Sequence, residues 1–169
     1  MNIVLCGMMG CGKTTTGSRL MVLTGMRCLD TDEIIVSRHG KISDIFEYYG
    51  EEKFRFFEAE VVREVAAEDN CVISTGGGCV LRTENVAALK RTGKIIYLDT
   101  GIDTLYRRAG HTGDDRPLLK GAGYDRMKSI LDARLPIYIG CADFTVKTDG
   151  RTPDEVAREI AALCGVPLL

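Results

Sequence analysis

The segment GMMGCGKTT, residues 7–15, constrains the fold of this chain more than any other part of it. It contains Gly7, Gly12, Lys13 and Thr14 in the pattern G-x-x-x-x-G-K-T, between an apolar β-branched stretch and a helical pattern. Glycines allow a turn whose backbone N–H groups point at phosphate oxygens, and a helix that starts there adds the positive end of its dipole. The segment therefore predicts a phosphate-binding loop between a strand and a helix, and with it nucleotide binding.

Each polar group of this loop has a predicted role. Lys13 is expected to reach the outer phosphates, and the Thr14 hydroxyl is expected to bind Mg²⁺. The nucleotide-binding positions of the loop are predicted to be Gly10, Cys11, Gly12, Lys13, Thr14 and Thr15. A phosphate loop is shared by switches, motors and kinases, so the acceptor of the phosphate has to be inferred from other residues.

Composition limits the class of protein and of partner. The 169 residues suit one domain, residues 1–169, and the formal net charge of −2 argues against nucleic acid or a membrane surface held by bulk charge. No apolar run is long enough to span a membrane, and residues 1–6 lack the basic start of a secretory signal. The seven cysteines form no C-x-x-C pair, which indicates a reduced, cytoplasmic protein without a disulfide framework. We expect a monomer that binds small molecules.

Strand-like and helix-like segments alternate along the chain. The pattern predicts strands over residues 2–6, 27–32, 71–75, 94–98 and 143–148. It predicts helices over 13–23, after a Thr31 cap, after a Ser43 cap, over 51–69, 83–90, around Arg107 and Arg108, over 124–134, and after a Thr152 cap with Pro153. Alternation of this kind indicates an α/β layer fold with a parallel sheet. Residues 110–123 are glycine-rich and irregular, and loops of this length are often lids.

Two acidic residues stand at the predicted end of the second strand, where ligands gather in open α/β sheets. Asp30 and Asp32 could divide the work, one holding the waters of a metal ion and the other orienting or deprotonating a substrate hydroxyl. The alternative is that both only cap the next helix.

Three further groups are candidates for binding anions or a ligand. Arg55 and Glu58 lie at i and i+3 on a helix among phenylalanines, which favours a partly buried site over a surface ion pair. The glycines at 76–78 follow a strand directly and suggest close approach of a ligand to the backbone. Arg116, in the 110–123 loop, could swing onto phosphates, although taken alone it reads as a solvated charge.

Six segments together resemble the shikimate kinases over nearly the whole chain. They are GMMGCGKTT, LDTDEII, FRFFE, STGGG, RPLL and RLPIY. The first is general among phosphate-loop proteins, whereas the others in this order and spacing are specific. The resemblance implies transfer of phosphate from ATP to the 3-hydroxyl of shikimate, a step toward chorismate and the aromatic amino acids. It also implies a three-layer P-loop fold with a five-stranded parallel sheet in the order 2-3-1-4-5.

The resemblance also implies roles for individual residues. Asp32 would bind the shikimate hydroxyls and act as or near the general base, and Lys13 and Arg116 would act on the phosphates. The shikimate site would lie on helices within residues 31–62 and beyond, with contacts from Asp32, Phe46, Phe54, Arg55, Glu58, Gly76, Gly77, Gly78 and Arg134. Arg55 and Arg134 would clamp the carboxylate. Asp30 would serve Mg²⁺ through water, and Arg108 and Arg151 would lie near the adenine.

Two other functions are compatible with the phosphate loop. Another small-molecule kinase, such as a gluconate kinase, would share Lys13 but should lack the set of Arg55, Gly77 and Arg134. A nucleotide-dependent binding domain would bind ATP without turnover. Separately, Cys11 lies where the helix dipole and Lys13 could lower its pKa, and we hypothesise a thiol whose alkylation blocks ATP binding.

Overall fold

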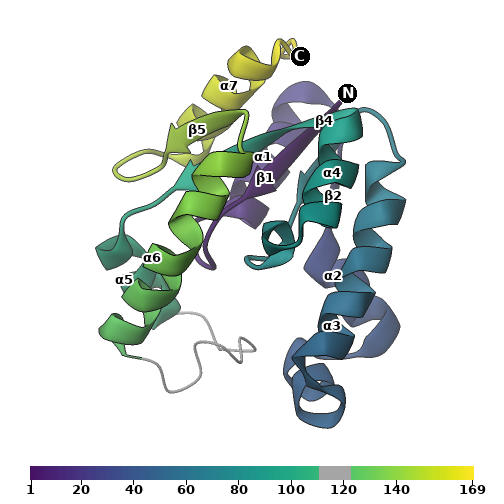
Figure 1. Cartoon of the computed structure of the whole chain (residues 1–169). Helices are drawn as coiled ribbons and strands as arrows, with labels where there is room; N and C mark the ends of the chain where they lie inside the picture. Colours follow the sequence, from purple (N-terminus) through teal and green to yellow (C-terminus); the bar gives the residue numbers. More distant parts are fainter. Residues whose placement is uncertain (111–122) are drawn as a thin grey trace.

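The protein is built around one parallel sheet. A computed structural model describes residues 1–110 and 123–169 (Figure 1). Its strands are β1 (Asn2–Cys6), β2 (Arg27–Asp30), β3 (Cys71–Ser74), β4 (Gly93–Asp99) and β5 (Phe144–Lys147). They form a five-stranded sheet in the order β2-β3-β1-β4-β5 with every pair parallel, which confirms the predicted fold and strand order.

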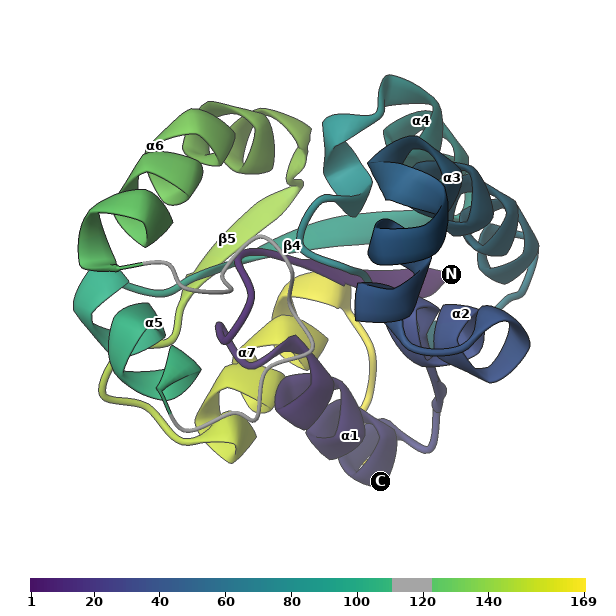
Figure 2. The same cartoon turned by 90° about the horizontal axis from the view of Figure 1, so that it is seen from below.

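Helices connect the strands and cover both faces of the sheet. They are α1 (Lys13–Thr24), α2 (Thr31–His39), α3 (Ile42–Ala66), α4 (Thr83–Thr92), α5 (Ile102–Ala109), α6 (Tyr124–Cys141) and α7 (Pro153–Cys164), with a short 3-10 turn η1 (Cys79–Leu81). Figure 2 shows α3, α4 and α6 on one side of the sheet and α1 and α7 on the other. Helices on both faces bury β1 and β3 entirely and most of β4, as is usual for parallel sheets, whereas the edge strands β2 and β5 stay partly exposed.

The central strand β1 explains how two cores form. Its side chains alternate between the faces, because successive residues of a strand point to opposite sides. Val4 and Cys6 belong to the core under α3, α4 and α6, whereas Ile3 and Leu5 belong to the core under α1 and α7. Both faces of the strand are therefore apolar, and the continuous run of buried residues follows from that.

The carboxyl ends of three neighbouring strands place the predicted motifs together. β1 ends at Cys6, directly before the phosphate loop; β2 ends at Asp30; and β3 ends at Ser74, directly before the glycines at 76–78. Because the strands are parallel and adjacent, these ends share one edge of the sheet. Open α/β sheets bind ligands at this edge.

The start of α2 differs from the prediction. The second strand stops at Asp30 rather than at residue 32, so Asp32 lies in the first turn of a helix and not on a strand end. Asp30, not Thr31, is the N-cap: its Oδ1 accepts from the backbone N–H groups of Asp32 at 2.9 Å and Glu33 at 3.2 Å. A carboxylate can accept two such bonds at once, which favours Asp30 over the hydroxyl of Thr31. Thr31 is fully buried instead.

Two other helices also have different bounds. The helix near Ser43 begins at Ile42, has Lys41 as its N-cap with no side-chain cap bond, and continues as α3 across a kink at Gly50. The helix predicted over 124–134 extends to Cys141, although Pro136 lies inside it. A proline costs one backbone hydrogen bond in a helix, and the buried side chains beyond it offset that loss. The Thr152 cap and Pro153 start of α7 are confirmed.

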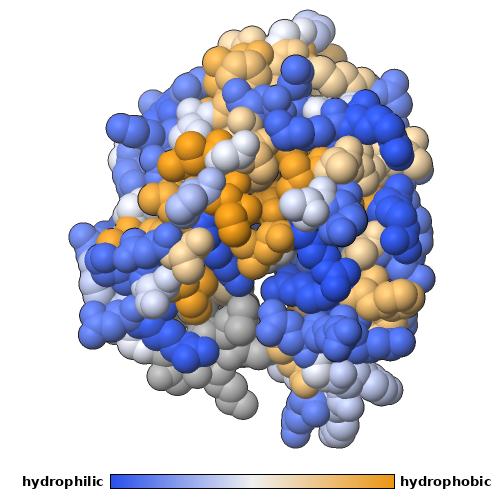
Figure 3. Space-filling view, viewed as in Figure 1, coloured by the Kyte–Doolittle hydropathy of each residue, from blue (hydrophilic) through white to orange (hydrophobic). Residues whose placement is uncertain are grey.

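One face of the molecule carries apolar side chains around α6. Figure 3 shows them gathered in the middle of the face that Figure 1 also presents. Ile137 and Ile139 on α6 and Leu81 in η1 are among the exposed apolar residues. Within residues 1–110 and 123–169, no helix is long and apolar enough to cross a membrane.

Candidate active site

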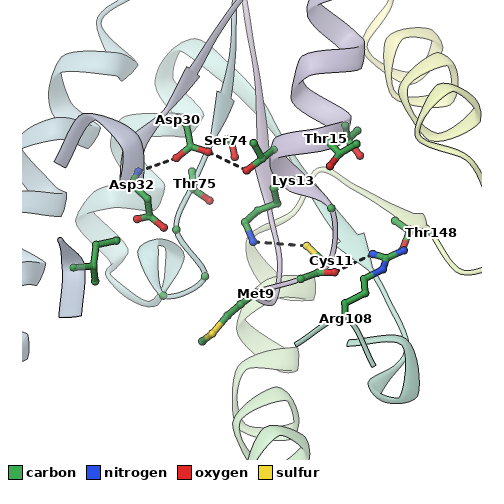
Figure 4. Close-up of a pocket in the computed structure, with 18 of the residues that line it drawn as sticks. Met9, Cys11, Lys13, Thr15, Asp30, Asp32, Ser74, Thr75, Arg108 and Thr148 are labelled. Carbon is green, nitrogen blue, oxygen red and sulfur yellow. Dashed lines mark hydrogen bonds between the residues drawn. The ribbon is translucent and has the colours of Figure 1, made fainter. Parts of the chain in front are cut away.

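A cavity of about 570 Å³ opens at the carboxyl edge of the sheet. This volume is within the usual range for small-molecule sites. Every predicted site residue that the structure describes lines it: Gly10, Cys11, Gly12, Lys13, Thr14, Thr15, Asp30, Asp32, Phe46, Phe54, Arg55, Glu58, Gly76, Gly77, Gly78, Arg108, Arg134 and Arg151. Arg116 lies outside the described residues. Segments far apart in the chain thus meet in one cavity, with the phosphate loop at its centre (Figure 4).

The phosphate loop folds around the amine of Lys13. Nζ of Lys13 donates to the carbonyls of Gly7 at 2.8 Å and Met8 at 3.1 Å, so the amine is held at the loop. Gly7 and Gly12 have φ of 145° and 97°, a region that L side chains rarely adopt. A Cβ at Gly7 would also lie 2.8 Å from Cys11 Sγ, so glycine is needed there for space as well. α1 begins at Lys13 and directs its N-terminus toward the cavity.

Cys11 is packed inside the loop. Its side chain is 1% exposed, and Lys13 Nζ lies 3.7 Å from its sulfur (Figure 4). Burial of the thiol restricts access by a reagent. We therefore expect slow alkylation, and the hypothesis that modification of Cys11 blocks ATP binding stays a prediction.

Asp30, Thr14 and Asp32 stand together where β2 meets the loop. The Thr14 hydroxyl donates to Asp30 Oδ2 at 3.1 Å, while Asp30 Oδ1 caps α2. Because Asp30 is hydrogen-bonded both to Thr14 and to the first turn of α2, it holds the start of α2 against the phosphate loop. Asp32 follows in the first turn of α2, and one of its oxygens lies 2.7 Å from where a Cβ at Gly76 would be. The Asp32 carboxylate therefore borders the glycine segment, on the acceptor side of the cavity.

Arg55 and Glu58 form a buried ion pair on α3 rather than a surface one. Nη1 of Arg55 lies 2.9 Å from Glu58 Oε1, and the two side chains are 13% and 1% exposed. Glu51 lies 3.4 Å from the same guanidinium, which also sits 5.1 Å above the ring of Phe54. Burial raises the pKa of Glu58, although Arg55 opposes the shift. Burial lowers the pKa of Arg55, but Glu58 and Glu51 outweigh it, so the net shift is upward.

Arg134 reaches the same region from α6. Its side chain is 7% exposed, and within the described part of the chain its Nη1 has no hydrogen-bond partner. That nitrogen lies 3.3 Å from where a Cβ at Gly77 would be. At Gly78, a Cβ would lie 2.5 Å from Nη2 of Arg55. Two guanidinium groups thus flank consecutive glycines. A buried donor without a protein partner, next to a second cation, is suited to a carboxylate or phosphate ligand.

The far end of the cavity contains the remaining arginines. Arg108 Nη1 donates to the Gly10 carbonyl at 2.9 Å, which joins α5 to the phosphate loop (Figure 4). Arg151 donates to the Lys147 carbonyl at 2.9 Å and pairs with Glu159, so it is fixed near the start of α7.

Sequence reasoning missed several residues that shape the cavity. Met9, Thr75, Thr148 and Pro153 line it, and Tyr138 donates to the Gly77 carbonyl at 2.6 Å from outside the predicted set. Met9 and Thr75 lie within the quoted motifs GMMGCGKTT and STGGG, so their place in a motif was an available signal. Tyr138 is 61 positions from Gly77, and no local pattern connects them.

Comparisons with known proteins agree with this geometry. The profile of the shikimate kinase family matches residues 9–164. A shikimate kinase of Symbiobacterium thermophilum is 48% identical over 163 residues, covering 95% of this chain and 94% of the relative. Among solved structures, a shikimate kinase from Acinetobacter baumannii in complex with shikimate has a TM-score of 0.91 at 35% identity, covering 96% of this chain and 91% of the other.

A shikimate kinase from Aquifex aeolicus has a TM-score of 0.83 at 36% identity, covering 96% of this chain and 95% of that one. The similarity extends over the phosphate loop and the acceptor side alike, since the family match over residues 9–164 includes all of the residues that line the cavity. The chain therefore belongs to the shikimate kinase family.

Proposed function

We propose that this protein transfers the γ-phosphate of ATP to the 3-hydroxyl of shikimate, giving shikimate 3-phosphate and ADP, a step toward chorismate and the aromatic amino acids. The observation that carries the proposal is the pair of arginines at the glycine segment. Arg55 and Arg134 flank Gly77 and Gly78, in the same cavity as the phosphate loop. A phosphate donor and a small carboxylate would therefore bind side by side.

In the proposed complex, the acceptor carboxylate lies between Arg55 and Arg134. Glu58 keeps Arg55 in place, because its Oε1 accepts from Nη1 at 2.9 Å. Phe46 and Phe54, whose rings are 5.1 Å apart, form an apolar wall. Shikimate is small and polar with one carboxylate, and bidentate arginine contacts suit that group. The backbone of Gly76, Gly77 and Gly78 supplies the close approach that a side chain would block.

The chemistry is assigned to residues on the two sides of the cavity. Asp32 accepts the proton of the attacking hydroxyl as general base, and Lys13 with the loop N–H groups neutralises charge on the phosphoryl group. Arg116, within the proposed lid of residues 110–123, is expected to contact the phosphates. Arg108 and Arg151 are proposed to lie near the adenine. The acceptor-binding helices are proposed to lie within residues 31–62 of a single domain, 1–169.

The residues at the β2 end fit a Mg²⁺ ion. Thr14 and Asp30 supply a hydroxyl and a carboxylate, the oxygen ligands that Mg²⁺ prefers. Thr14 already donates its proton to Asp30 at 3.1 Å, so its lone pairs stay available to a metal. Among residues 1–110 and 123–169, no three His, Cys, Asp or Glu side chains could form a metal site by themselves. That suits an ion held mainly by phosphates and water, which would neutralise phosphate charge in transfer.

An acceptor screen tests the proposal against its alternatives. ADP release is measured with MgATP and shikimate, with gluconate, and without acceptor. We expect turnover with shikimate only. Turnover with gluconate alone would indicate another small-molecule kinase, and ATP binding without turnover would indicate a binding module.

We further propose a cytoplasmic monomer. All seven cysteines are free thiols, which supports a reducing compartment. Size-exclusion chromatography with light scattering should give a mass near 18.5 kDa. A stable dimer mass would contradict the monomer.

A further inference from the structure

The glycine segment at the acceptor site has no side chains of its own to hold it. Its backbone is held from outside: Gly76 N–H donates to the Thr31 hydroxyl at 3.1 Å, and the Gly76 and Gly78 carbonyls accept from Cys79 and Leu81 N–H at 3.1 and 3.2 Å. The middle carbonyl, that of Gly77, accepts from the Tyr138 hydroxyl at 2.6 Å. Tyr138 is thus the side chain that fixes the orientation of the central peptide.

This bond also determines where the next N–H points. The chain has no cis peptide bonds among its described residues, and in a trans peptide the C=O and the following N–H point in opposite directions. With the Gly77 carbonyl directed at α6, the Gly78 N–H is directed away from α6. Glycine backbones rotate more freely than any other, so without the hydroxyl this peptide could turn.

Tyr138 is itself held rigidly. Its side chain is fully buried, and its ring stacks on Tyr97 of β4 with centroids 5.1 Å apart and planes 15° from parallel. The stack ties α6 to the centre of the sheet. The hydroxyl at the end of such a fixed ring has little freedom, so the position of the Gly77 carbonyl follows from the position of the sheet.

The same tyrosine lies one helical turn from Arg134. Residues four apart share one face of a helix, so Arg134 and Tyr138 both reach the glycine segment. Pro136 lies between them and removes one backbone hydrogen bond from α6, which weakens the helix at this point. Anchoring by the stack and by the Gly77 carbonyl keeps Arg134 in a constant place beside Gly77. Its Nη1 lies 3.3 Å from where a Cβ at Gly77 would be.

We propose that Tyr138 is a positioning residue for the acceptor, which orients the Gly77–Gly78 peptide and Arg134 together through its hydroxyl and its stack on Tyr97. The inference rests on the proposed function, because it assigns the acceptor to this part of the cavity. Tyr138 acts on acceptor binding rather than on ATP, since its hydroxyl donates to the glycine segment.

The test is Tyr138→Phe, which removes the hydroxyl and keeps the ring. We expect the KM for shikimate to rise about five- to tenfold, as for the loss of one hydrogen bond, with the KM for ATP within about twofold of the wild type. Amide hydrogen exchange should quicken in the 74–82 segment. Tyr97→Phe is the matched control, because it removes a hydroxyl from the same stack and leaves the bond to Gly77 in place; both KM values should stay unchanged.

Several results would overturn the proposal. They are an unchanged shikimate KM in Tyr138→Phe, an equal rise in both KM values, or the same effect in Tyr97→Phe. Wild-type protein that releases no ADP with shikimate would instead overturn the proposed function, while exchange in Tyr138→Phe would still report on the bond.

If Tyr138→Phe does not fold, NMR of the wild type decides. The buried Tyr138 hydroxyl proton should exchange slowly and shift on addition of shikimate but not of ADP. An unshifted resonance in the presence of bound shikimate would contradict the positioning role.

Discussion

A carboxylate as buried as that of Glu58, whose side chain is 1% exposed, needs a cation beside it. Arg55 supplies that cation and at the same time is proposed to bind the acceptor. The second carboxylate oxygen of Glu58, Oε2, has no hydrogen-bond partner within the described part of the chain. The pair therefore links the stability of α3 to the binding of the acceptor, and the two effects can be separated by mutation.

Arg55→Ala should raise the KM for shikimate about 10- to 100-fold and leave ATP affinity nearly unchanged, because a charge-assisted contact to the carboxylate is lost. It should also destabilise the fold by about 3–5 kcal/mol, since Glu58 is left buried without its cation. Steady-state kinetics and urea unfolding measure the two effects.

The double variant Arg55→Ala/Glu58→Gln separates them. Without a buried charge it should recover part of the stability, yet it should remain defective with shikimate. Recovery of shikimate binding in the double variant would rule out Arg55 as a direct ligand.

The titration of Glu58 predicts how stability depends on pH. Burial raises the pKa of Glu58, so the folded protein holds this proton to a higher pH than the unfolded chain does. The contribution of Glu58 to stability is therefore complete below the unfolded value of about 4.3 and is lost as pH rises through the folded pKa. The free energy of unfolding of Glu58→Gln, minus that of the wild type, should increase across this window. Urea unfolding of both proteins at a series of pH values measures it; a constant or falling difference would mean that the pKa is not raised.

At the phosphate loop, we expect replacement of Lys13 to slow the chemical step. Lys13→Ala should lower kcat about 10²–10³-fold, as for the loss of one contact to transition-state charge. Single-turnover measurements with shikimate and MgATP give the rate of the chemical step. A near-normal rate would mean that Lys13 does not contact the transferring phosphoryl group.

At the scale of elements, α3 shows how a kink can serve a site. Gly50 has φ 83° and ψ 169°, which lets the helix change direction between the part that carries Phe46 and the part that carries Arg55. Both side chains line the cavity, so the kink brings two helical segments to one ligand site. This backbone region is essentially restricted to glycine.

Gly50→Ala should destabilise the protein by about 1–3 kcal/mol through backbone strain. A steric clash would not contribute, because a Cβ at this position would meet no atom within 4 Å. Gly140→Ala is the control: its Cβ also meets nothing within 4 Å, but the residue lies inside α6 without a positive φ. That change should stabilise by about 0.4–1 kcal/mol. Thermal unfolding of both variants distinguishes strain from steric effects, and equal destabilisation would refute the explanation for Gly50.

At the scale of the whole molecule, the cavity joins segments from both halves of the sheet. Residues of α1, α2, α3, α5, α6 and α7 all line it. A ligand in this cavity contacts the folded protein and not the unfolded chain, so it should stabilise the entire fold.

Shikimate and ADP, each at about 100 times its Kd, should each add about 2.7 kcal/mol and raise Tm by roughly 5–10 °C for a chain of this size. Gluconate should not change Tm. Differential scanning fluorimetry measures the shifts, and Arg55→Ala should lose the shikimate shift but keep that of ADP. A shikimate shift that survives in this variant would indicate another binding place.

Most of the architecture could be predicted from the chain itself, because local patterns encode it. The phosphate loop needs glycines at defined backbone angles and a lysine at the start of a helix, and all of these are consecutive residues. The alternation of strands and helices likewise reflects short-range hydrophobic periods. The exact ends of elements could not be predicted as well. Asp30 and Thr31 are both good N-cap residues, but the Thr31 hydroxyl is engaged by the N–H of Gly76, 45 positions away, which no local pattern shows.

The arrangement of the acceptor side was determined by tertiary structure. Arg134 and Gly77 are far apart in the chain, and only the packing of α6 on the sheet places a guanidinium beside that glycine. Tyr138 looked like an ordinary residue of a motif, yet its hydroxyl meets a carbonyl 61 positions away. Local sequence determines which elements form and which chemical groups they carry. The distances between those groups are determined by how the helices pack, because each contact joins residues that no local pattern relates.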